Sequence, residues 1–441
     1  MSDERTQTLP QGERKKDTSS PSRPGLLLLH APDGQAPRCI TLARETTLGR
    51  QPDQTIFVAD GALSRSHAKL SVQRKAMHVE DLGSHNGTFV DGVELERGRS
   101  AALAPGQVLR CGDTVLMAVV DVEPYAQWPA SFSTGPLLGG PSMAQVRLQI
   151  ELSSASGLAV LLHGESGTGK EVAARLLHGV SGRPGEFIPV NCAAVPPALF
   201  EAELFGSVRG AFTGASGDRA GLIVASARGT LFLDEIGELP VEVQPKLLRA
   251  VELGEVRPVG AQQAREVQLH LVAASHRRLD AEVAAGRFRE DLYHRVRGVQ
   301  IEIPPLRERR DDAWLFARRC LEQLRRSDGG AWALEGGFVE KVLLERWSGN
   351  VRQLEHAVRE ATIHAALEGA ERLAPHHLRG TSEGVAKVQL GQEQEIDRVV
   401  AALRRCKGNV VAAAQNLGMA RSRLYSLLRQ GGLRAADFRQ D

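Results

Sequence analysis

The chain is poor in cysteine and in aromatic residues, and it has almost no net charge. Of its 441 residues only 5 are Cys and 4% are aromatic, and the formal net charge is +2. The cysteines are scattered without a Cys-x-x-Cys pair, which argues against zinc and disulfide frameworks and favours a reducing cytoplasm. No hydrophobic run approaches the roughly 20 residues that span a bilayer, and the first residues lack the apolar core of a signal peptide. We therefore expect a cytoplasmic protein that does not contact a membrane.

The composition changes along the chain, which indicates several domains. Short apolar runs between turn residues over 26–122 are typical of an all-β sandwich, whereas residues 138–380 alternate helical patterns with apolar strands, as α/β domains do. Residues 393–441 show only helical patterns. The remaining stretches are polar or rich in Pro, Gly and Ser, and we expect a disordered tail at 1–25 and linkers at 123–137 and 381–392. The predicted fold is multidomain, with all-β, α/β and all-α parts.

A glycine-rich loop lies between a predicted strand at 158–163 and a predicted helix that begins near Glu171. Glycines let backbone N–H groups converge on phosphate oxygens, the helix N-terminus favours negative charge, and Lys170 can reach the terminal phosphates. Glu171 stands where a Ser or Thr usually helps to hold Mg²⁺. A Gly-rich turn without a ligand is the alternative, but the order of strand, loop and helix favours a nucleotide site. The predicted ATP-binding residues of this loop are Gly164, Glu165, Ser166, Gly167, Thr168, Gly169, Lys170 and Glu171.

A second apolar strand, in Gly-Thr-Leu-Phe-Leu-Asp-Glu at 229–235, ends in two carboxylates. Asp234 would hold the metal, directly or through water, and Glu235 would polarise the attacking water. Acidic residues after a strand are often only caps, but the upstream phosphate loop favours the catalytic interpretation. We therefore predict that Lys170, Asp234 and Glu235 are catalytic and that Asp234 is the Mg²⁺ ligand.

The segment Gly-Ala-Phe-Thr-Gly-Ala at 210–215 follows neither helical nor strand periodicity, which predicts a loop. Phe212 on such a loop is an apolar side chain exposed to water unless a partner buries it. The alternative is a packed loop whose Phe belongs to the core.

These motifs, together with Gly-Arg-Phe-Arg-Glu-Asp-Leu-Tyr-His-Arg at 286–295 and Trp-Ser-Gly-Asn-Val-Arg at 347–352, closely resemble the AAA+ domain of bacterial sigma-54-dependent transcription activators. The resemblance implies an ATPase with a small helical lid that uses ATP and Mg²⁺ and usually forms a hexameric ring. It implies that Asn191 holds Glu235 until ATP is bound. It also implies that Arg289 and Arg295 reach a neighbouring subunit's nucleotide, while Arg352 contacts the nucleotide from the lid. The implied sigma-54 contacts are Gly210, Ala211, Phe212, Thr213, Gly214 and Ala215.

One stretch departs from that family. Where the family usually has Ala-Thr-Asn, this chain has Ala274, Ser275 and His276. His276 replaces an amide with a titratable ring, which leaves open how hydrolysis is coupled to loop movement.

The C-terminal segment has two helical patterns on either side of Gly418, and it resembles the Fis-like helix-turn-helix domain of the same activators. From Ile396 to Asp441 there are nine Lys and Arg against three Asp and Glu, an excess that would attract DNA phosphates. A helical protein–protein module is the alternative. The predicted DNA-contacting residues are Arg421, Ser422, Arg423, Tyr425, Ser426 and Arg429.

The N-terminal sandwich contains motifs around Arg50, Ser64 and Asn86 that resemble forkhead-associated (FHA) domains. The resemblance implies binding of phosphothreonine peptides, for which Arg50 and Arg65 would supply charge-assisted donors, Ser64 a hydroxyl and Asn86 an amide. It assigns His67 a structural role and implies input from a Ser/Thr kinase. A scaffold that has lost phosphopeptide binding is the alternative.

Taken together, the motifs predict an ATP-dependent transcriptional activator that binds upstream enhancer DNA and remodels sigma-54 RNA polymerase holoenzyme under phosphothreonine control. An AAA+ unfoldase would share the ATPase parts but needs neither the loop at 210–215 nor a basic helix-turn-helix. The third interpretation is a DNA-binding sensor with a decayed ATPase. The presence of Lys170, Asp234 and Glu235 argues against it.

Overall fold

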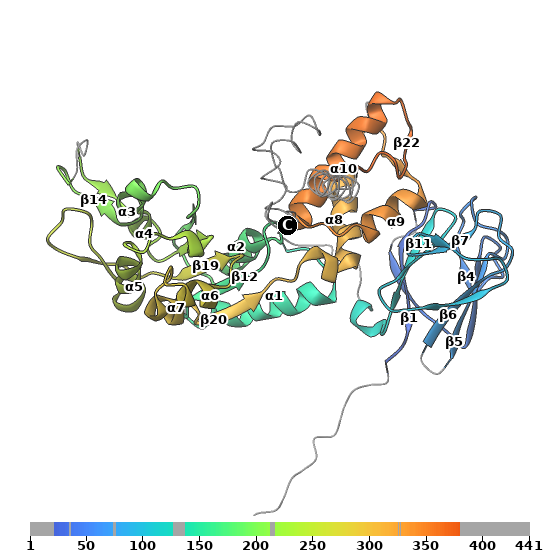
Figure 1. The fold of residues 1–441 in the computed structure, drawn as a ribbon, viewed down its shortest axis with the longest axis horizontal. Coiled ribbons are helices and arrows are strands. Elements are labelled where there is room, and N and C mark those ends of the chain that lie inside the picture. Colours follow the sequence, from blue (N-terminus) through green and yellow to red (C-terminus); the bar gives the residue numbers. More distant parts are fainter. Residues whose placement is uncertain are drawn as a thin grey trace, which may run out of the picture. The chain divides into compact units, whose positions relative to one another are not determined.

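The structure is a computed structural model that describes residues 22–379, apart from 35–36, 74–75, 127–136, 212–216, 325 and 327. The chain divides into two compact units, one within Met1–Gln145 and one within Val146–Asp441 (Figure 1). The predicted disordered tail lies almost wholly outside the described residues, and the helix-turn-helix with its predicted DNA contacts lies entirely outside them. In the described residues, no helix combines the length and the hydropathy needed to cross a membrane.

The first unit is a sandwich of two β-sheets, as the sequence predicts. One sheet has six strands in the order β2 (Arg38–Thr41), β1 (Gly25–His30), β11 (Thr114–Val119), β10 (Val108–Cys111), β7 (Thr88–Val90) and β8 (Val93–Glu94). The other has five, in the order β4 (Ile56–Phe57), β3 (Glu45–Gly49), β5 (Ala68–Gln73), β6 (Ala76–Asp81) and β9 (Ser100–Leu103). A short 3₁₀ helix, η1 (Glu123–Tyr125), follows.

The sandwich forms because its strands bury one face each. Along β6 the buried residues alternate with more exposed ones, which is the pattern of a sheet with one solvated face. Leu26, Leu28, Leu70 and Val79 are fully buried between the two sheets. The sandwich leaves its loops exposed at the ends of the strands, where ligand-binding residues can lie without disturbing this core.

The second unit contains a five-stranded parallel sheet in the order β13 (Phe187–Asn191), β16 (Thr230–Asp234), β19 (Leu271–Ser275), β12 (Val160–His163) and β20 (Val299–Glu302). β19 is buried along its whole length, and β16 is buried up to Asp234, because helices cover both faces of the sheet. The carboxyl ends of parallel strands meet at one edge, which brings His163, Asp234 and Ser275 to the same side of the sheet.

The helices around this sheet are α1 (Pro141–Ser154), α2 (Lys170–Val180), α3 (Pro197–Phe205), α4 (Leu222–Ala225), α5 (Gln244–Leu253), α6 (Leu279–Ala284) and α7 (Glu290–Val296), with 3₁₀ turns η2 (Ile236–Glu238) and η3 (Leu306–Glu308). Two short antiparallel pairs lie among them: β14 (Gly206–Ser207) with β15 (Arg219–Ala220), and β17 (Glu255–Val256) with β18 (Arg265–Glu266).

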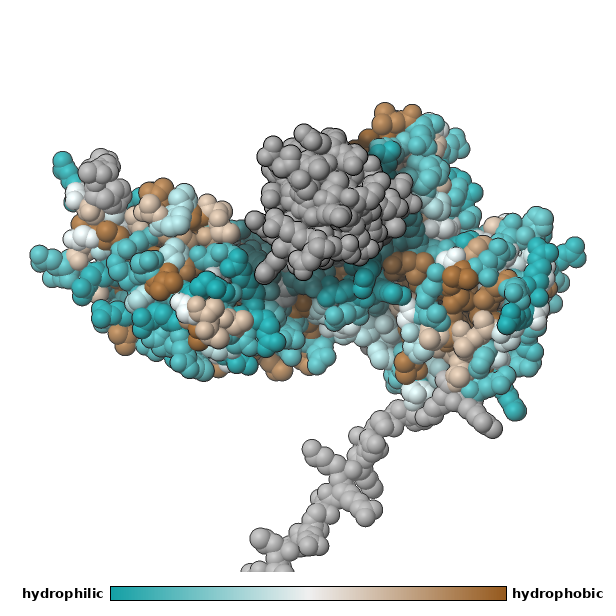
Figure 2. Space-filling view, in the orientation of Figure 1, coloured by the Kyte–Doolittle hydropathy of each residue, from teal (hydrophilic) through white to brown (hydrophobic). Residues whose placement is uncertain are grey.

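A small helical lid follows η3. It consists of α8 (Arg310–Gln323), α9 (Gly336–Leu344), α10 (Asn350–Leu367) and the parallel pair β21 (Ala333–Leu334) with β22 (Arg372–Leu373). α8 packs against both α9 and α10, and Trp314 and Phe338 are buried. Figure 2 shows hydrophobic surface at the C-terminal end of α10, where Ile363 and Leu367 are exposed.

Candidate nucleotide-binding site

The glycine-rich loop connects β12 to α2, as the sequence predicts, and its backbone demands glycine at two positions. Gly167 and Gly169 have φ angles of 78° and 104°, a region that other residues rarely adopt. A Cβ atom on Gly167 would also lie 2.3 Å from the carbonyl oxygen of Gly349, whereas one on Gly169 would meet nothing within 4 Å. The loop therefore needs Gly167 to approach the lid, while the surroundings of Gly169 leave room for a ligand.

Lys170 begins α2 and lies under the loop. Its side chain is only 6% exposed, and its Nζ atom donates to the carbonyl oxygens of Gly164, at 2.9 Å, and of Glu165, at 3.2 Å. The same Nζ lies 3.7 Å from Oε1 of Glu235. A buried cation that the described residues hold through two carbonyls and one carboxylate can exchange those contacts for phosphate oxygens.

Two carboxylates end β16 beside this lysine. Burial and then the charge of Glu235 raise the pKa of Asp234 above its usual range, and Lys170 only partly offsets them. Glu235 has a φ of 53°, an uncommon backbone conformation that the surrounding contacts must maintain. Crowded carboxylates with one nearby cation have the donor chemistry that Mg²⁺ prefers.

Glu235 is bonded to a residue to which the sequence assigned no contact. Its Oε2 lies 2.5 Å from Nδ1 of His276 and accepts from the backbone N–H of His276 at 3.3 Å. Asn191, which the family resemblance assigns to Glu235, uses its Oδ1 to accept from the backbone N–H of Ala193 at 2.9 Å.

The lid docks onto the loop through contacts that sequence reasoning missed. Asn350 is fully buried with a φ of 54°, and its Nδ2 donates to Oε2 of Glu165 at 3.1 Å and to the carbonyl oxygen of Ser166 at 3.0 Å. Arg307 forms a 2.7 Å ion pair with Glu165, and this pairing lowers the pKa of the Glu165 carboxyl. Arg352, the predicted lid arginine, contacts Ser166 Oγ at 3.4 Å. Asn350 belongs to the Gly-Asn-Val-Arg motif, and this motif was the feature of the sequence that could have indicated its contact with the loop.

Further contacts surround this docking site. The buried Arg309 side chain donates from its NH2 group to the carbonyl oxygen of Thr168 at 3.0 Å and forms a 3.3 Å ion pair with Asp312. Glu171, in contrast, is exposed and accepts from Arg175, one turn along α2, at 2.7 Å. Glu171 therefore points its carboxylate along the helix surface.

Arg289 and Arg295, which are predicted to reach a neighbouring subunit's nucleotide, lie in and beside α7 of the second unit. Arg289 precedes α7 and makes a two-bond pair with its neighbour Asp291, at 3.1 and 2.8 Å. Arg295, on α7, donates to the carbonyl oxygen of Val251 at 3.2 Å. Both side chains are exposed.

Comparison with known proteins agrees with this geometry. Three family models match: the FHA domain over residues 46–112, the sigma-54 interaction domain over 138–302 and the AAA+ ATPase lid domain over 307–389. The response regulator protein PilR of Pseudomonas aeruginosa is 42% identical over 312 residues, which cover 67% of this chain and 69% of PilR. The transcriptional regulatory protein ZraR of Escherichia coli K12 is 40% identical over 320 residues, covering 70% and 71%. This chain belongs to the sigma-54-dependent transcription activators.

A solved structure extends the likeness. The crystal structure of NtrX from Brucella abortus in complex with ATP matches with a TM-score of 0.51 and 28% identity, covering 68% of this chain and 70% of NtrX. The predicted fold class is therefore confirmed for the FHA sandwich and for the AAA+ domain with its lid, and the activator is an AAA+ ATPase. The domain boundaries expected from the sequence stay predictions.

The activator's loop at 210–215 is described only at its start. Gly210 is exposed with a φ of 79°, and Ala211 follows it, whereas Phe212, Thr213, Gly214 and Ala215 lie outside the described residues. The strands on either side, β14 and β15, pair with Gly206 opposite Ala220. The backbone N–H of Arg209 also donates to Oδ1 of Asp218 at 2.9 Å. The loop therefore has a closed base, with its two ends held together.

In the activator's FHA domain, three loops meet. The backbone N–H of Arg50 donates to the Ser64 carbonyl oxygen at 3.1 Å, and the Ser64 hydroxyl accepts from the backbone N–H of His85 at 3.1 Å. Asn86 Nδ2 donates to the Ala62 carbonyl oxygen at 2.8 Å. The side chains of Arg50, Arg65 and Asn86 are exposed. The backbone is fixed while the side chains face solvent.

His67 lies beneath these loops and is fully buried. Its Nδ1 accepts from the backbone N–H of Ser64 at 3.1 Å, so its Nε2 carries the proton that is donated to the carbonyl oxygen of Gly87 at 3.1 Å. Burial lowers the pKa of His67 and thus favours this neutral form. His67 joins the loop of Ser64 to the loop of Gly87.

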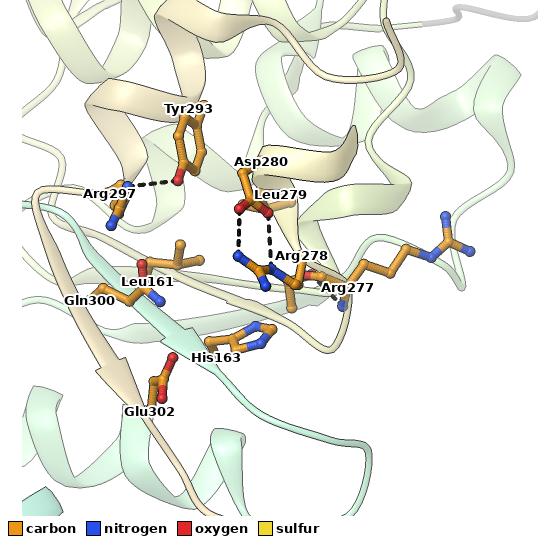
Figure 3. A pocket seen from close by; sticks show the side chains of 11 residues that line it. Leu161, His163, Arg277, Arg278, Leu279, Asp280, Tyr293, Arg297, Gln300 and Glu302 are labelled. Atoms are coloured by element: carbon orange, nitrogen blue, oxygen red, sulfur yellow. Dashed lines mark hydrogen bonds and ion pairs between the residues drawn. The ribbon is translucent and has the colours of Figure 1, made fainter. Parts of the chain in front are cut away.

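A cavity of about 230 Å³ lies beside the loop that follows β19 (Figure 3). Its arginines have partners of their own: Arg278 pairs with Asp280 at 2.8 Å, and Arg297 donates to the Tyr293 hydroxyl at 2.8 Å. The cavity is lined by α6, α7 and the strands β12 and β20, and each of these two pairs lies within one helical segment.

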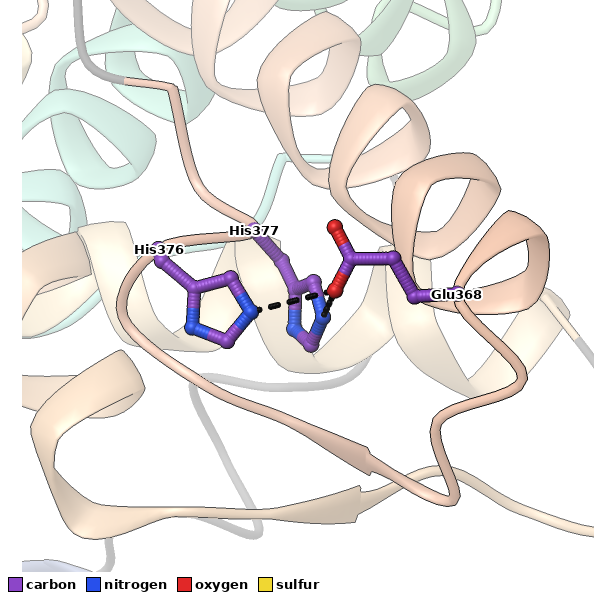
Figure 4. Close-up of side chains that lie close together, drawn as sticks. All are labelled: Glu368, His376 and His377. Carbon is purple, nitrogen blue, oxygen red and sulfur yellow. Dashed lines mark hydrogen bonds and ion pairs between the residues drawn. The ribbon is translucent and has the colours of Figure 1, made fainter.

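A cluster of Glu368, His376 and His377 on the lid has the residue types of a metal site (Figure 4). Nε2 of His376 and of His377 lie 3.2 and 3.0 Å from the same Glu368 oxygen. However, Nδ1 of His377 accepts from the backbone N–H of Ala374 at 2.9 Å, so its Nε2 carries the proton and has no lone pair for a metal. The cluster therefore fits hydrogen bonding from the two rings to one carboxylate.

Proposed function

We propose that this activator hydrolyses ATP with Mg²⁺ and uses the energy to remodel sigma-54 RNA polymerase holoenzyme at promoters whose upstream DNA it binds. The observation that carries the proposal is the placement of Lys170 and Glu235 around the glycine loop, with the lid docked on that loop through Asn350. The family supports the polymerase as the target.

The residues divide the chemistry among themselves. The backbone N–H groups of 164–169 and the Lys170 ammonium bind the phosphates, and Arg352 approaches from the lid. The Glu235 carboxylate accepts a hydrogen bond from a water molecule. The oxygen of this water then forms the new bond to the γ-phosphorus. The bond between that phosphorus and the departing ADP oxygen breaks, ADP keeps the electron pair, and the water's proton leaves through Glu235 or the phosphate.

The carboxylate pair fits a divalent cation. Asp234, with its raised pKa and its neighbouring charge, would hold Mg²⁺, and the ion would neutralise charge on the phosphates. Glu171 is turned toward Arg175, so Asp234 would be the main protein ligand of such an ion, in contrast to loops that offer a hydroxyl at this position.

We infer that subunits assemble head to tail in a ring, usually a hexamer in this family, so that Arg289 and Arg295 reach the next subunit's nucleotide. Their exposure supports this role. The pair with Asp291 uses two of the five N–H donors of the Arg289 guanidinium, so the other three could donate to the phosphate of a neighbouring subunit's nucleotide.

Residues outside the nucleotide site are proposed to recognise sigma-54, the DNA and the regulatory signal. Residues 210–215 are proposed to contact sigma-54, and Arg421, Ser422, Arg423, Tyr425, Ser426 and Arg429 to contact enhancer DNA. Arg50, Ser64, Arg65 and Asn86 are proposed to bind a phosphothreonine in a partner phosphorylated by a Ser/Thr kinase. Such a protein acts in the cytoplasm, where the polymerase works.

The experiment is promoter opening by the purified full-length protein with sigma-54 holoenzyme and supercoiled promoter DNA. Opening with ATP, and none with a non-hydrolysable analogue, is the expected result. ATP hydrolysis without opening at any sigma-54 promoter would instead favour an unfoldase, and absence of hydrolysis would favour a sensor with a decayed ATPase.

A further inference from the structure

His276 and Glu235 are brought together from 41 residues apart, at the ends of two neighbouring strands. β16 ends directly before Glu235 and β19 directly before His276, and the two strands pair in parallel. The Glu235 carboxylate is 17% exposed, and the His276 ring 43%. The pairing of β16 with β19 therefore brings the two side chains together, at the edge of the nucleotide site.

The two oxygens of Glu235 have different surroundings. A carboxylate offers about four lone-pair directions, two on each oxygen. His276 occupies both directions on Oε2, through Nδ1 at 2.5 Å and through its backbone N–H at 3.3 Å. Within the described part of the chain, Oε1 has a single looser contact, the Lys170 ammonium at 3.7 Å. When Lys170 turns to a phosphate, Oε1 becomes available while Oε2 stays bound.

Among the residues that the structure describes, Asn191, which was expected to hold this carboxylate, makes no hydrogen bond with it. Asn191 Oδ1 accepts from the Ala193 backbone N–H, two residues along the chain. Glu235 also holds an uncommon φ of 53°, which needs restraint from its neighbours. Its backbone is held by the Glu235 N–H, which donates to Oδ1 of Asp234 at 3.0 Å, and by its carbonyl oxygen, which accepts from the Glu238 N–H at 2.9 Å, while His276 holds the carboxylate at the other end of the side chain.

We propose that His276 is the positioning residue of this ATPase: it anchors Oε2 of Glu235 so that Oε1 is the oxygen that polarises the attacking water. The inference rests on the proposed ATP hydrolysis and adds to it a residue in which this chain departs from its family. His276 acts through Glu235 and does not itself touch the substrate. With Glu235 ionised, the proton of the short contact is on Nδ1, because a carboxylate only accepts.

The test is steady-state ATP hydrolysis by the full-length protein and its His276→Ala and His276→Asn variants. A hydrogen bond to a charged group corresponds to about a tenfold to hundredfold effect on rate, so His276→Ala should lower kcat by that factor. KM for ATP should change little, because the phosphate contacts remain. His276→Asn should restore most of kcat, since its Nδ2 can donate where Nδ1 did.

The matched control is His376→Ala, which removes another exposed imidazole that contacts a carboxylate, at 3.2 Å from Glu368 on the lid. It should hydrolyse ATP at the wild-type rate. If His276→Ala does not fold, as judged by its thermal unfolding, the comparison moves to His276→Asn and His276→Asp. These two have the same shape, but only the amide can donate to Glu235, so Asn should be active and Asp inactive.

Three results are distinguishable. No hydrolysis by the wild-type protein would overturn the proposed function itself. Wild-type hydrolysis with an equally active His276→Ala variant, or with equal activities of His276→Asn and His276→Asp, would overturn only the role of His276. A faster His276→Ala variant would also overturn it, because it would mean that His276 holds Glu235 away from the water.

Discussion

The two candidate binding sites of this activator are built in opposite ways. At the nucleotide site the functional side chains are already bonded to one another: Lys170 is 6% exposed and lies 3.7 Å from Glu235. In the FHA domain the backbones are tied together beneath, by His67, while Arg50 and Arg65 point into solvent. The nucleotide must therefore replace internal contacts, whereas a phosphopeptide meets side chains on a finished frame. Substitutions should change chemistry and structure together at the first site, and recognition alone at the second.

The largest expected effect is at the first site. Lys170→Ala should lose both nucleotide binding and hydrolysis, because the phosphates lose their fixed cation. Glu235→Gln should bind ATP but reduce hydrolysis to background, since an amide polarises water far less than a carboxylate. Fluorescent-nucleotide binding and phosphate release separate the two. Normal turnover by Glu235→Gln would remove Glu235 from the mechanism.

The next effect concerns the neighbouring subunit. Arg289→Ala and Arg295→Ala should each lower ATP turnover by about 10³–10⁵, as arginine fingers do. Each mutant should still bind nucleotide, because neither residue belongs to the glycine loop. A finger mutant mixed with a Lys170→Ala mutant, each inactive alone, should regain part of the activity in mixed rings. Inactivity at every mixing ratio would argue against action on a neighbour.

A smaller effect tests the docking of the lid. Asn350→Ala should destabilise the second unit by about 1–3 kcal/mol, because it leaves the buried N–H of Leu306 without its acceptor and removes the bonds to Glu165 and Ser166. Thermal unfolding measures this loss. Asn350→Gly is the matched control, since Gly tolerates the φ of 54°. If both variants melt at the wild-type temperature, the lid does not depend on Asn350.

These contacts also show which features the sequence could predict. The glycine loop and the pair at 234–235 are local patterns whose chemistry can be inferred from adjacent residues. The bond from Asn350 to Glu165 joins residues 185 positions apart, and the contact of His276 with Glu235 exists only because β16 and β19 are neighbours in the sheet. Such pairs depend on strand order, which a single sequence does not state. The orientation of Asn191 toward Ala193 is likewise a matter of the local turn.

The smallest structural effect is expected in the FHA domain. Arg50→Ala should abolish phosphothreonine-peptide binding yet change stability by no more than about 0.5 kcal/mol, as exposed substitutions usually do. His67→Ala should instead destabilise the domain by about 1–3 kcal/mol, because Ser64 N–H and the Gly87 carbonyl lose their buried partner. Calorimetry with phosphorylated and unphosphorylated peptides, alongside thermal unfolding, measures both. Equal affinity of the wild-type protein for the two peptides would leave the domain as a scaffold.

The central claim is that nucleotide chemistry at Lys170 and Glu235 is transmitted to sigma-54 through the loop at 210–215. The most direct measurement compares ATP hydrolysis and promoter opening in one preparation of Thr213→Ala. The account predicts near-normal hydrolysis and ring assembly, loss of sigma-54 binding in the presence of a transition-state analogue, and no open promoter. Promoter opening at the wild-type level by Thr213→Ala would contradict it.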